Sequence, residues 1–181
     1  MKAIALTIEH LADYRALMLQ AYTLHPNAFT STAQERAALP ESWWARRLET
    51  GPAAESQAFG VTQGGVLVGA VALTYATRPK TRHKSTLVGM YVRESSQHQG
   101  VGSCLVQAVL AAAHQRSGVR LVQLTVSETN PRAKRLYERN GFVPFGVEPF
   151  AMLGTEGYVA KCHMWCSLSA TPASEKSKMP Q

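Results

Sequence analysis

The chain has 181 residues, 45% of them hydrophobic, which is typical of one globular domain with a sizeable core. No apolar run approaches the ~18 residues of a membrane helix, and the N-terminus carries no signal-peptide cleavage site, so we expect neither a membrane span nor a leader. Three cysteines, an odd number, argue against a disulfide scaffold and predict a cytoplasmic protein. The net charge of +7 favours polyanionic partners, but no basic run is long enough to predict nucleic-acid binding.

Hydrophobic periodicity and turn residues divide the chain into strands and helices. Pro40 interrupts the second helical region and begins its second piece, and Gly64-Gly65 is the turn of a hairpin. In chain order we expect a strand at 2–8, a helix at 9–24, a helix in two pieces at 32–49, strands at 57–62, 66–76 and 86–92, a helix at 103–117, a strand at 119–126, a helix at 130–140, and strands at 142–150 and 157–168.

This order, βααβββαβαββ, predicts an α/β fold in which about four helices cover a mixed sheet of six to seven strands. We expect residues 1–168 to form a single domain. The small, polar segment 169–181 reads as a disordered tail.

Cys162 and Cys166, with His163 between them, invite a metal-site interpretation. Their segment has the pattern of a strand, in which four residues span about 13 Å. Two thiolates on one zinc ion must each lie about 2.3 Å from it. A straight strand forbids that arrangement, so we predict no metal site.

A glycine-rich turn lies between the strand at 86–92 and the helix at 103–117. Its sequence is Gln97-His98-Gln99-Gly100-Val101-Gly102-Ser103. Two glycines one residue apart let the backbone turn and approach a ligand without Cβ clashes. The following helix directs free N–H groups and the positive end of its dipole at that ligand. The turn therefore predicts a seat for the pyrophosphate of a phosphorylated cofactor.

The last helix carries a second recognisable pattern. Asn130 is placed to cap its N-terminus and Gly141 follows its C-terminus. Ala133, Leu136 and Tyr137 share one face at i, i+3 and i+4. Such a stripe usually packs in the core. Only its combination with the glycine-rich turn upstream favours a catalytic role for the Tyr137 phenol. The charged residues are expected mostly on other faces: Arg132, Arg135, Glu138 and Arg139.

Together these segments resemble the GNAT superfamily of acyl-CoA-dependent N-acetyltransferases. The phosphate-loop pattern of that family, Gln/Arg-x-x-Gly-x-Gly/Ala, is matched by Gln97, Gly100 and Gly102. A second family signature, Asn-x-x-Ala-x-x-Leu-Tyr-x-x-x-Gly-Phe, is matched by Asn130, Ala133, Leu136, Tyr137, Gly141 and Phe142. The core of the resemblance covers about residues 84–143.

The resemblance implies that the fourth and fifth strands splay apart and that acetyl-CoA, as co-substrate, lies in the cleft. Its pantetheine arm would pair with the fourth strand through the amides of Met90, Tyr91 and Val92, one of which would polarise the thioester carbonyl. Asn130 would hydrogen-bond the same arm, and Ala133 belongs to the same cofactor site. The pyrophosphate would be held by the amides of Gln97, His98, Gln99, Gly100, Val101, Gly102 and Ser103.

In the same family Tyr137 would face the sulfur. A free thiol has a pKa of ~8.5 and a tyrosine ~10, so a nearby phenol can donate a proton as the C–S bond breaks. The reaction implied is acetyl transfer to a primary amine by direct attack in a ternary complex. The acceptor stays open, from a small amine or an antibiotic to a protein lysine, and homodimers are common in the family.

The general base that would deprotonate the amine is not evident. Many relatives carry a Glu on the fourth strand, but residues 86–92 contain no carboxylate. Glu35 is favoured because its region lines the acceptor site in the family, although a solvated helix glutamate is the commoner case. The other candidates are Glu128, Glu148, His83 or a water chain.

Four aromatic residues are predicted to line the acceptor site: Phe29, Trp44, Phe150 and Tyr158. The alternative interpretation of these four residues is ordinary packing. Trp43, next to Trp44 on a helix, cannot face the same way as Trp44.

A Walker loop is excluded because no Lys-Ser/Thr follows the glycines. A dinucleotide fingerprint lacks its third glycine, where Leu105 stands. The rival from another class is a non-catalytic acyl-CoA-binding module, which would not need the phenol.

Overall fold

The computed structural model describes residues 1–168, so the tail predicted over 169–181 lies outside the described residues. One seven-stranded sheet has the order β1-β2-β3-β4-β5-β7-β6. Its β4–β5 pair is parallel and its other pairs are antiparallel. The strands are β1 (Ile4–Ala5), β2 (Ser56–Gln63), β3 (Val66–Tyr75), β4 (Lys84–Val92), β5 (Leu121–Ser127), β6 (Val143–Gly154) and β7 (Gly157–Ser167).

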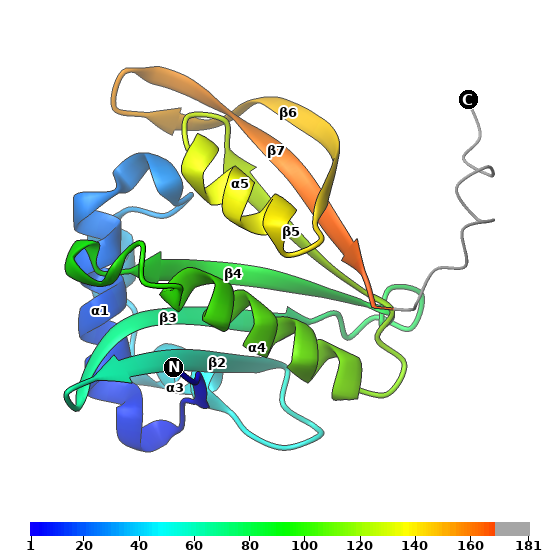
Figure 1. Ribbon diagram of the computed structural model, residues 1–181. Coiled ribbons are helices and arrows are strands. Elements are labelled where there is room, and N and C mark those ends of the chain that lie inside the picture. The colour runs from blue at the N-terminus through cyan, green and yellow to red at the C-terminus, as the bar shows by residue number, and fades with distance from the viewer. Residues whose placement is uncertain (169–181) are drawn as a thin grey trace.

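Helices cover both faces of this sheet, with α4 on one side and α1 on the other (Figure 1). None of the helices within residues 1–168 is long and apolar enough to cross a membrane. The α-helices are α1 (Leu11–Leu24), α2 (Ala33–Ala37), α3 (Glu41–Ala45), α4 (Val101–Gln115) and α5 (Pro131–Arg139).

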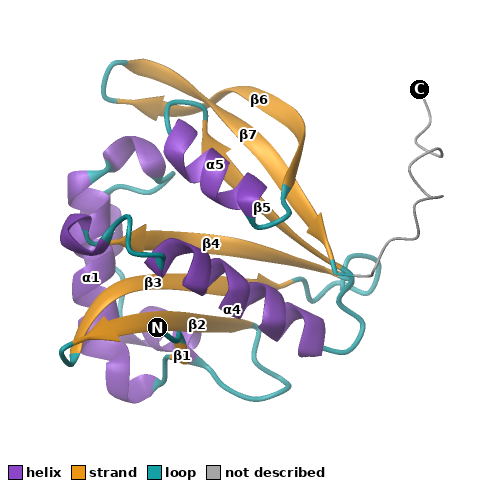
Figure 2. Cartoon of the chain, in the orientation of Figure 1, coloured by secondary structure: helices purple, strands orange, loops and turns teal. Residues whose placement is uncertain are grey.

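Alternation along β3 explains why there are two apolar cores. Val71 and Leu73 point to the core under α4, whereas Ala70 and Ala72 point to the core under α1. A strand places successive side chains on opposite faces of a sheet, so one apolar run serves both layers. The layers are seen in Figure 2, where the orange sheet lies between purple helices.

The predicted fold class is confirmed, with a mixed sheet of seven strands and five α-helices rather than about four. The additional helix arises at Pro40, which ends the turn after α2 and precedes the first residue of α3. The hairpin turn is also as predicted, because Gly64 and Gly65 have φ of 56° and 79°, the left-handed values of a tight hairpin turn. The first strand is shorter than the 2–8 expected.

The two central strands part soon after they meet. β4 pairs with β5 only from Lys84 to Thr86, opposite 121–123. Figure 1 shows the two strands diverging from that end, which confirms the predicted splay. Gly89, at φ 60°, forms a bulge where the β3 register jumps, and the positive φ favours glycine there. The rest of β4 therefore presents an unpaired backbone edge toward β5.

Candidate active site

Two cavities adjoin at the gap between β4 and β5. The larger, about 800 Å³, lies beside the N-terminus of α4 and the inner face of α5. The smaller, about 270 Å³, lies on the side of α1, α2 and α3. Six residues line both cavities: Ala28, Phe29, Met90, Asn130, Ala133 and Tyr137. A ligand in one cavity can therefore touch a ligand in the other beside Tyr137.

Local sequence fixes the position of Tyr137. The Asn130 side chain accepts a hydrogen bond from the Ala133 amide at 3.0 Å and begins α5, as predicted. After α5, Gly141 has φ 88° and the Phe142 amide donates to the Tyr137 carbonyl at 3.1 Å. Both ends of this short helix are thus held by hydrogen bonds, which restricts where its phenol can point.

The Tyr137 hydroxyl reaches across the gap from α5 to β4. It lies 3.5 Å from the sulfur of Met90, and the ring packs edge-on against Phe142 at 5.8 Å. Only 7% of the residue is exposed. Burial raises the pKa of Tyr137 well above its usual value, and no charged neighbour opposes that shift. The phenol is therefore a neutral hydrogen-bond donor at the junction of the two cavities.

The glycine-rich turn is tied to both of its neighbours. Gln97 donates from its side-chain amide to the Val92 carbonyl at 2.9 Å and accepts from Arg132 at 2.6 Å. Gly100 has φ 83° at the N-cap of α4, with open space where a Cβ would lie. The turn thus presents backbone rather than side chain to the larger cavity.

Gly102 has a packing role in addition to the ligand approach predicted from the sequence. A Cβ there would lie 2.9 Å from a methyl carbon of Leu136 and 3.4 Å from the terminal methyl of Met90. This glycine therefore allows α4 to pack closely on α5. The close contact keeps the start of α4 and the Tyr137 helix in one fixed arrangement.

Most of the predicted cofactor residues line the larger cavity: Met90, Tyr91, Val92, Gln97, His98, Gly100, Gly102, Ser103, Asn130 and Ala133. Gln99 and Val101 do not. The Gln99 side chain hydrogen-bonds Gln63 and the Ser95 carbonyl, and Val101 packs in the core at 1% exposure.

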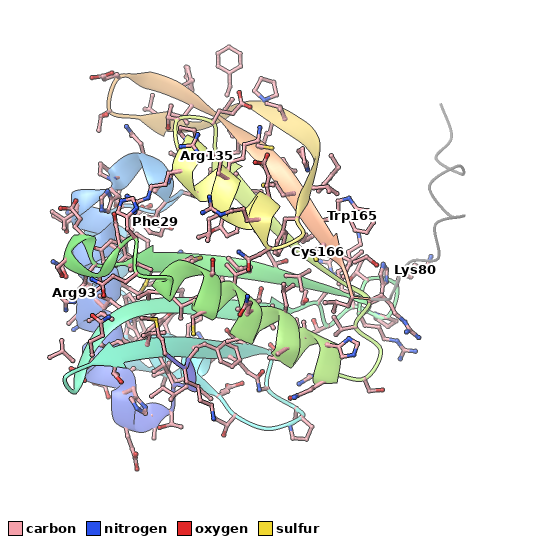
Figure 3. All side chains as sticks on the ribbon, viewed as in Figure 1. Phe29, Lys80, Arg93, Arg135, Trp165 and Cys166 are labelled. Carbon is pink, nitrogen blue, oxygen red and sulfur yellow. The ribbon has the colours of Figure 1, made fainter. Side chains whose placement is uncertain are left out.

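Two arginines of α5 that were expected on other faces of the helix border the larger cavity. Arg132 and Arg139 line the larger cavity, because they stand four residues before and three after Leu136 and share its side of the helix. Arg135 and Glu138 line neither cavity, as expected. Figure 3 shows Arg135 on α5 away from α4. The spacing around Leu136 was the signal that could have identified the arginine pair.

The predicted acceptor residues separate into two groups. Phe29 lines both cavities, and Figure 3 shows it on the segment after α1 that borders the gap. Trp44 lines the smaller cavity at 1% exposure, and so does Trp43, whose ring lies 5.1 Å away at 83°. Phe150 and Tyr158 line neither cavity; they are 74% and 67% exposed and pack on each other at 5.2 Å.

Glu35 is engaged in capping rather than in a cavity wall. Its carboxylate accepts from the Thr32 amide at 2.7 Å and from the Thr32 hydroxyl at 2.9 Å, which lowers its pKa. The other candidate bases, His83, Glu128 and Glu148, line neither cavity either. Glu148 contacts His163 at 3.0 Å. Among residues 1–168, no group of three metal-ligand side chains converges.

The sequence matches the acetyltransferase (GNAT) family over residues 18–142, more than half of the chain. The chain therefore belongs to the GNAT acetyltransferase family, which confirms the resemblance noted from its motifs. The comparison with curated proteins gives no match.

Solved structures share the whole fold at low identity. Smu.2055 from Streptococcus mutans has a TM-score of 0.79 at 17% identity, with 93% of this chain and 100% of that one covered. YncA, a putative acetyltransferase of Salmonella typhimurium solved with acetyl-CoA, has a TM-score of 0.77 at 17% identity, with 96% of this chain and 96% of that one covered. A GCN5-related N-acetyltransferase from Kribbella flavida has a TM-score of 0.75 at 23% identity, with 92% of this chain and 96% of that one covered.

Proposed function

We propose that residues 1–168 form one N-acyltransferase domain that moves an acetyl group from acetyl-CoA to a primary amine by direct attack in a ternary complex. The observation that carries this proposal is the Tyr137 hydroxyl, which stands where the two cavities adjoin. The larger cavity takes acetyl-CoA and the smaller one takes the acceptor. The thioester carbon then lies between them, within reach of both the amine and the phenol.

The larger cavity has the features that a coenzyme A thioester needs. At the N-cap of α4 a Cβ on Gly100 would meet open space, which leaves room for a phosphate near the helix N-terminus, and Arg132 and Arg139 add positive charge there. The unpaired edge of β4 beyond Thr86 offers amides and carbonyls to the pantetheine arm, as an added strand would use them. An amide of this edge near Met90 is the proposed donor to the thioester carbonyl.

Tyr137 serves as the general acid in this scheme. As the amine nitrogen bonds to the acetyl carbon, the C–S bond breaks and the sulfur takes a proton from the phenol. The nitrogen loses its surplus proton to water, and the phenolate regains a proton from water, so that the phenol is restored. Burial keeps the phenol protonated because it raises the pKa of Tyr137. The same burial disfavours a thiolate, so the leaving sulfur needs that proton more than it would in water.

Direct attack is favoured over a covalent enzyme intermediate. Cys104, Cys162 and Cys166 are free thiols, and none of them lines either cavity. A cysteine nucleophile would have to reach the thioester. The free thiols also support the proposed cytoplasmic location.

The test is a panel of primary amines offered with acetyl-CoA, with thiol release as the readout. We expect release that depends on the acceptor and yields an acetylated amine in equal amount. Slow thioester hydrolysis that is the same with every amine would instead favour the alternative, a non-catalytic acyl-CoA-binding module.

A further inference from the structure

The smaller cavity is lined by three cationic side chains. Arg36 comes from α2, Arg47 from the 3-10 turn after α3, and Lys161 from β7. Within residues 1–168, no aspartate or glutamate lines this cavity. The rest of its polar and aromatic wall is formed by six aromatic side chains and six serine, threonine and asparagine side chains. The cavity is therefore strongly positive and partly apolar.

Within residues 1–168, no carboxylate lies within ion-pair distance of these cations, although Glu35 and Glu148 act on Arg36 and Lys161 electrostatically. The ion pairs found there join His25 to Glu94 and His163 to Glu148. Lys161 is only 8% exposed and donates to the Thr30 hydroxyl. Glu148 is its register partner on β6 and attracts the Lys161 ammonium group, but the Glu148 carboxylate forms its hydrogen bond with His163. Arg36 and Arg47 are half-buried and Lys161 is buried. Positive charge that is partly withdrawn from water and not ion-paired is costly, so an anion from outside would be bound favourably.

The two guanidinium groups are held in place by the same aromatic ring. Arg36 lies 4.4 Å and Arg47 4.7 Å from the centre of the Trp43 ring. The Nε of Arg36 is buried and has no hydrogen-bond partner within residues 1–168. A planar, preoriented guanidinium with a free donor is suited to an oxyanion such as a carboxylate.

We propose that the acceptor is a small primary amine that also carries an oxyanion, in the manner of a free amino acid. The oxyanion binds Arg36, Arg47 and Lys161, while the amine lies beside Tyr137. This inference rests on the proposed acetyl transfer and names its substrate class. A cavity of about 270 Å³ suits a molecule of amino-acid size, and the aromatic wall suits an apolar side chain.

The positive cavity also bears on the missing general base. A like charge nearby disfavours an ammonium ion, so the amine loses its proton more readily than in water. Three cations outnumber one carboxylate, so this effect persists when the acceptor is bound. Deprotonation to water then needs no carboxylate in the cavity wall.

The test compares acceptors that share one side chain: phenylalanine, phenylalaninamide and phenethylamine, with the phosphonate analogue of phenylalanine as a second anion. We expect kcat/KM to be ~10-fold or more higher for the two acceptors that carry an anionic group than for the two that lack one, as for a charge-assisted contact. The amide has the less basic amine, so its larger neutral fraction works against the expected order. Equal or better rates with the amide and phenethylamine would overturn the inference while leaving acetyl transfer intact.

Variants assign the effect to the cations. Arg47→Gln and Lys161→Met should each raise KM for phenylalanine ~10-fold without raising KM for phenethylamine. The kcat with both acceptors should fall, because one cation fewer disfavours the ammonium form less, and Arg47→Lys should restore part of the preference for phenylalanine. Arg46→Gln is the matched control, because Arg46 is exposed and lines neither cavity. An equal rise in KM for both acceptors, or the same rise in KM for phenylalanine in Arg46→Gln, would contradict the assignment.

A binding readout separates this inference from the proposed activity. Titration calorimetry with 3-phenylpropionate, which has no amine, should show binding that Arg47→Gln weakens, and 3-phenylpropionamide should bind less well. If no amine is acetylated yet this pattern holds, acetyl transfer fails and the anion site stands. If neither probe discriminates, the anion site is refuted whatever the activity.

Discussion

The hydroxyl of Tyr137 can be tested apart from the rest of the site. Tyr137→Phe keeps the ring that packs on Phe142 and removes the donor near Met90. We expect kcat to fall by ~100-fold, as for loss of a general acid, with KM for acetyl-CoA nearly unchanged. Initial rates of thiol release over a series of acetyl-CoA concentrations measure both parameters.

Tyr75→Phe is the control for that variant. Tyr75 also loses a hydroxyl contact, its hydrogen bond to Gln57, but it lines neither cavity. Its kcat should equal that of the parent protein. A Tyr137→Phe variant with unchanged kcat would remove this phenol from the mechanism.

The raised pKa of Tyr137 gives a pH prediction. Because the shift is upward from about 10, the phenol stays protonated from about pH 6 to about pH 9. The rate should rise with pH in this range as the amine loses its proton, and it should not fall on the alkaline side. A profile of kcat with saturating acceptor measures this. A descending limb below about pH 9 that disappears in Tyr137→Phe would contradict the pKa direction.

Among the elements, β4 is the one whose shape sets the gap. Gly89→Ala should destabilise the fold by about 1–2 kcal/mol, because Gly89 has φ 60° and an L-residue is strained there. Steric contact adds little, since the new Cβ would lie 3.5 Å from the end of Met18. Urea unfolding gives the free energy.

Gly146→Ala is the matched strand control, because a Cβ meets open space at Gly146 and its φ is not positive. We expect no comparable loss of stability there. If the free energy of unfolding falls by the same amount in both variants, a general effect of replacing glycine rather than the bulge of β4 explains the result.

For the molecule as a whole, the net charge of +7 should assist capture of the polyanionic cofactor. Raising the ionic strength from about 0.1 M to about 1 M shortens the screening length from about 10 Å to about 3 Å. We expect kcat/KM for acetyl-CoA to fall by roughly 10-fold, with kcat nearly constant. Initial rates over a salt series measure this.

Arg132→Gln and Arg139→Gln should flatten that salt dependence, because both residues line the larger cavity. Arg135→Gln is the control on the same helix, and it should keep the parent slope. Equal slopes for all three variants would mean that these two arginines do not contribute more than the general surface charge.

Short-range sequence signals were sufficient for most of the elements and for the turn and helix caps that border the larger cavity. Gly100, Asn130 and Gly141 act through their own backbone geometry, which depends on neighbours within a few residues. The same holds for Pro40, which divides the helical region after α1. Such features follow from local chemistry and are therefore legible in one sequence.

Packing between distant segments decided what surrounds the smaller cavity. Glu35 precedes Arg36, which lines the smaller cavity, yet the Glu35 carboxylate caps its own helix at Thr32. Arg36 and Lys161 lie 125 positions apart in the chain and line one wall only because β7 pairs beside β5. No local pattern encodes that convergence, since it depends on where the sheet opens and which layer covers it.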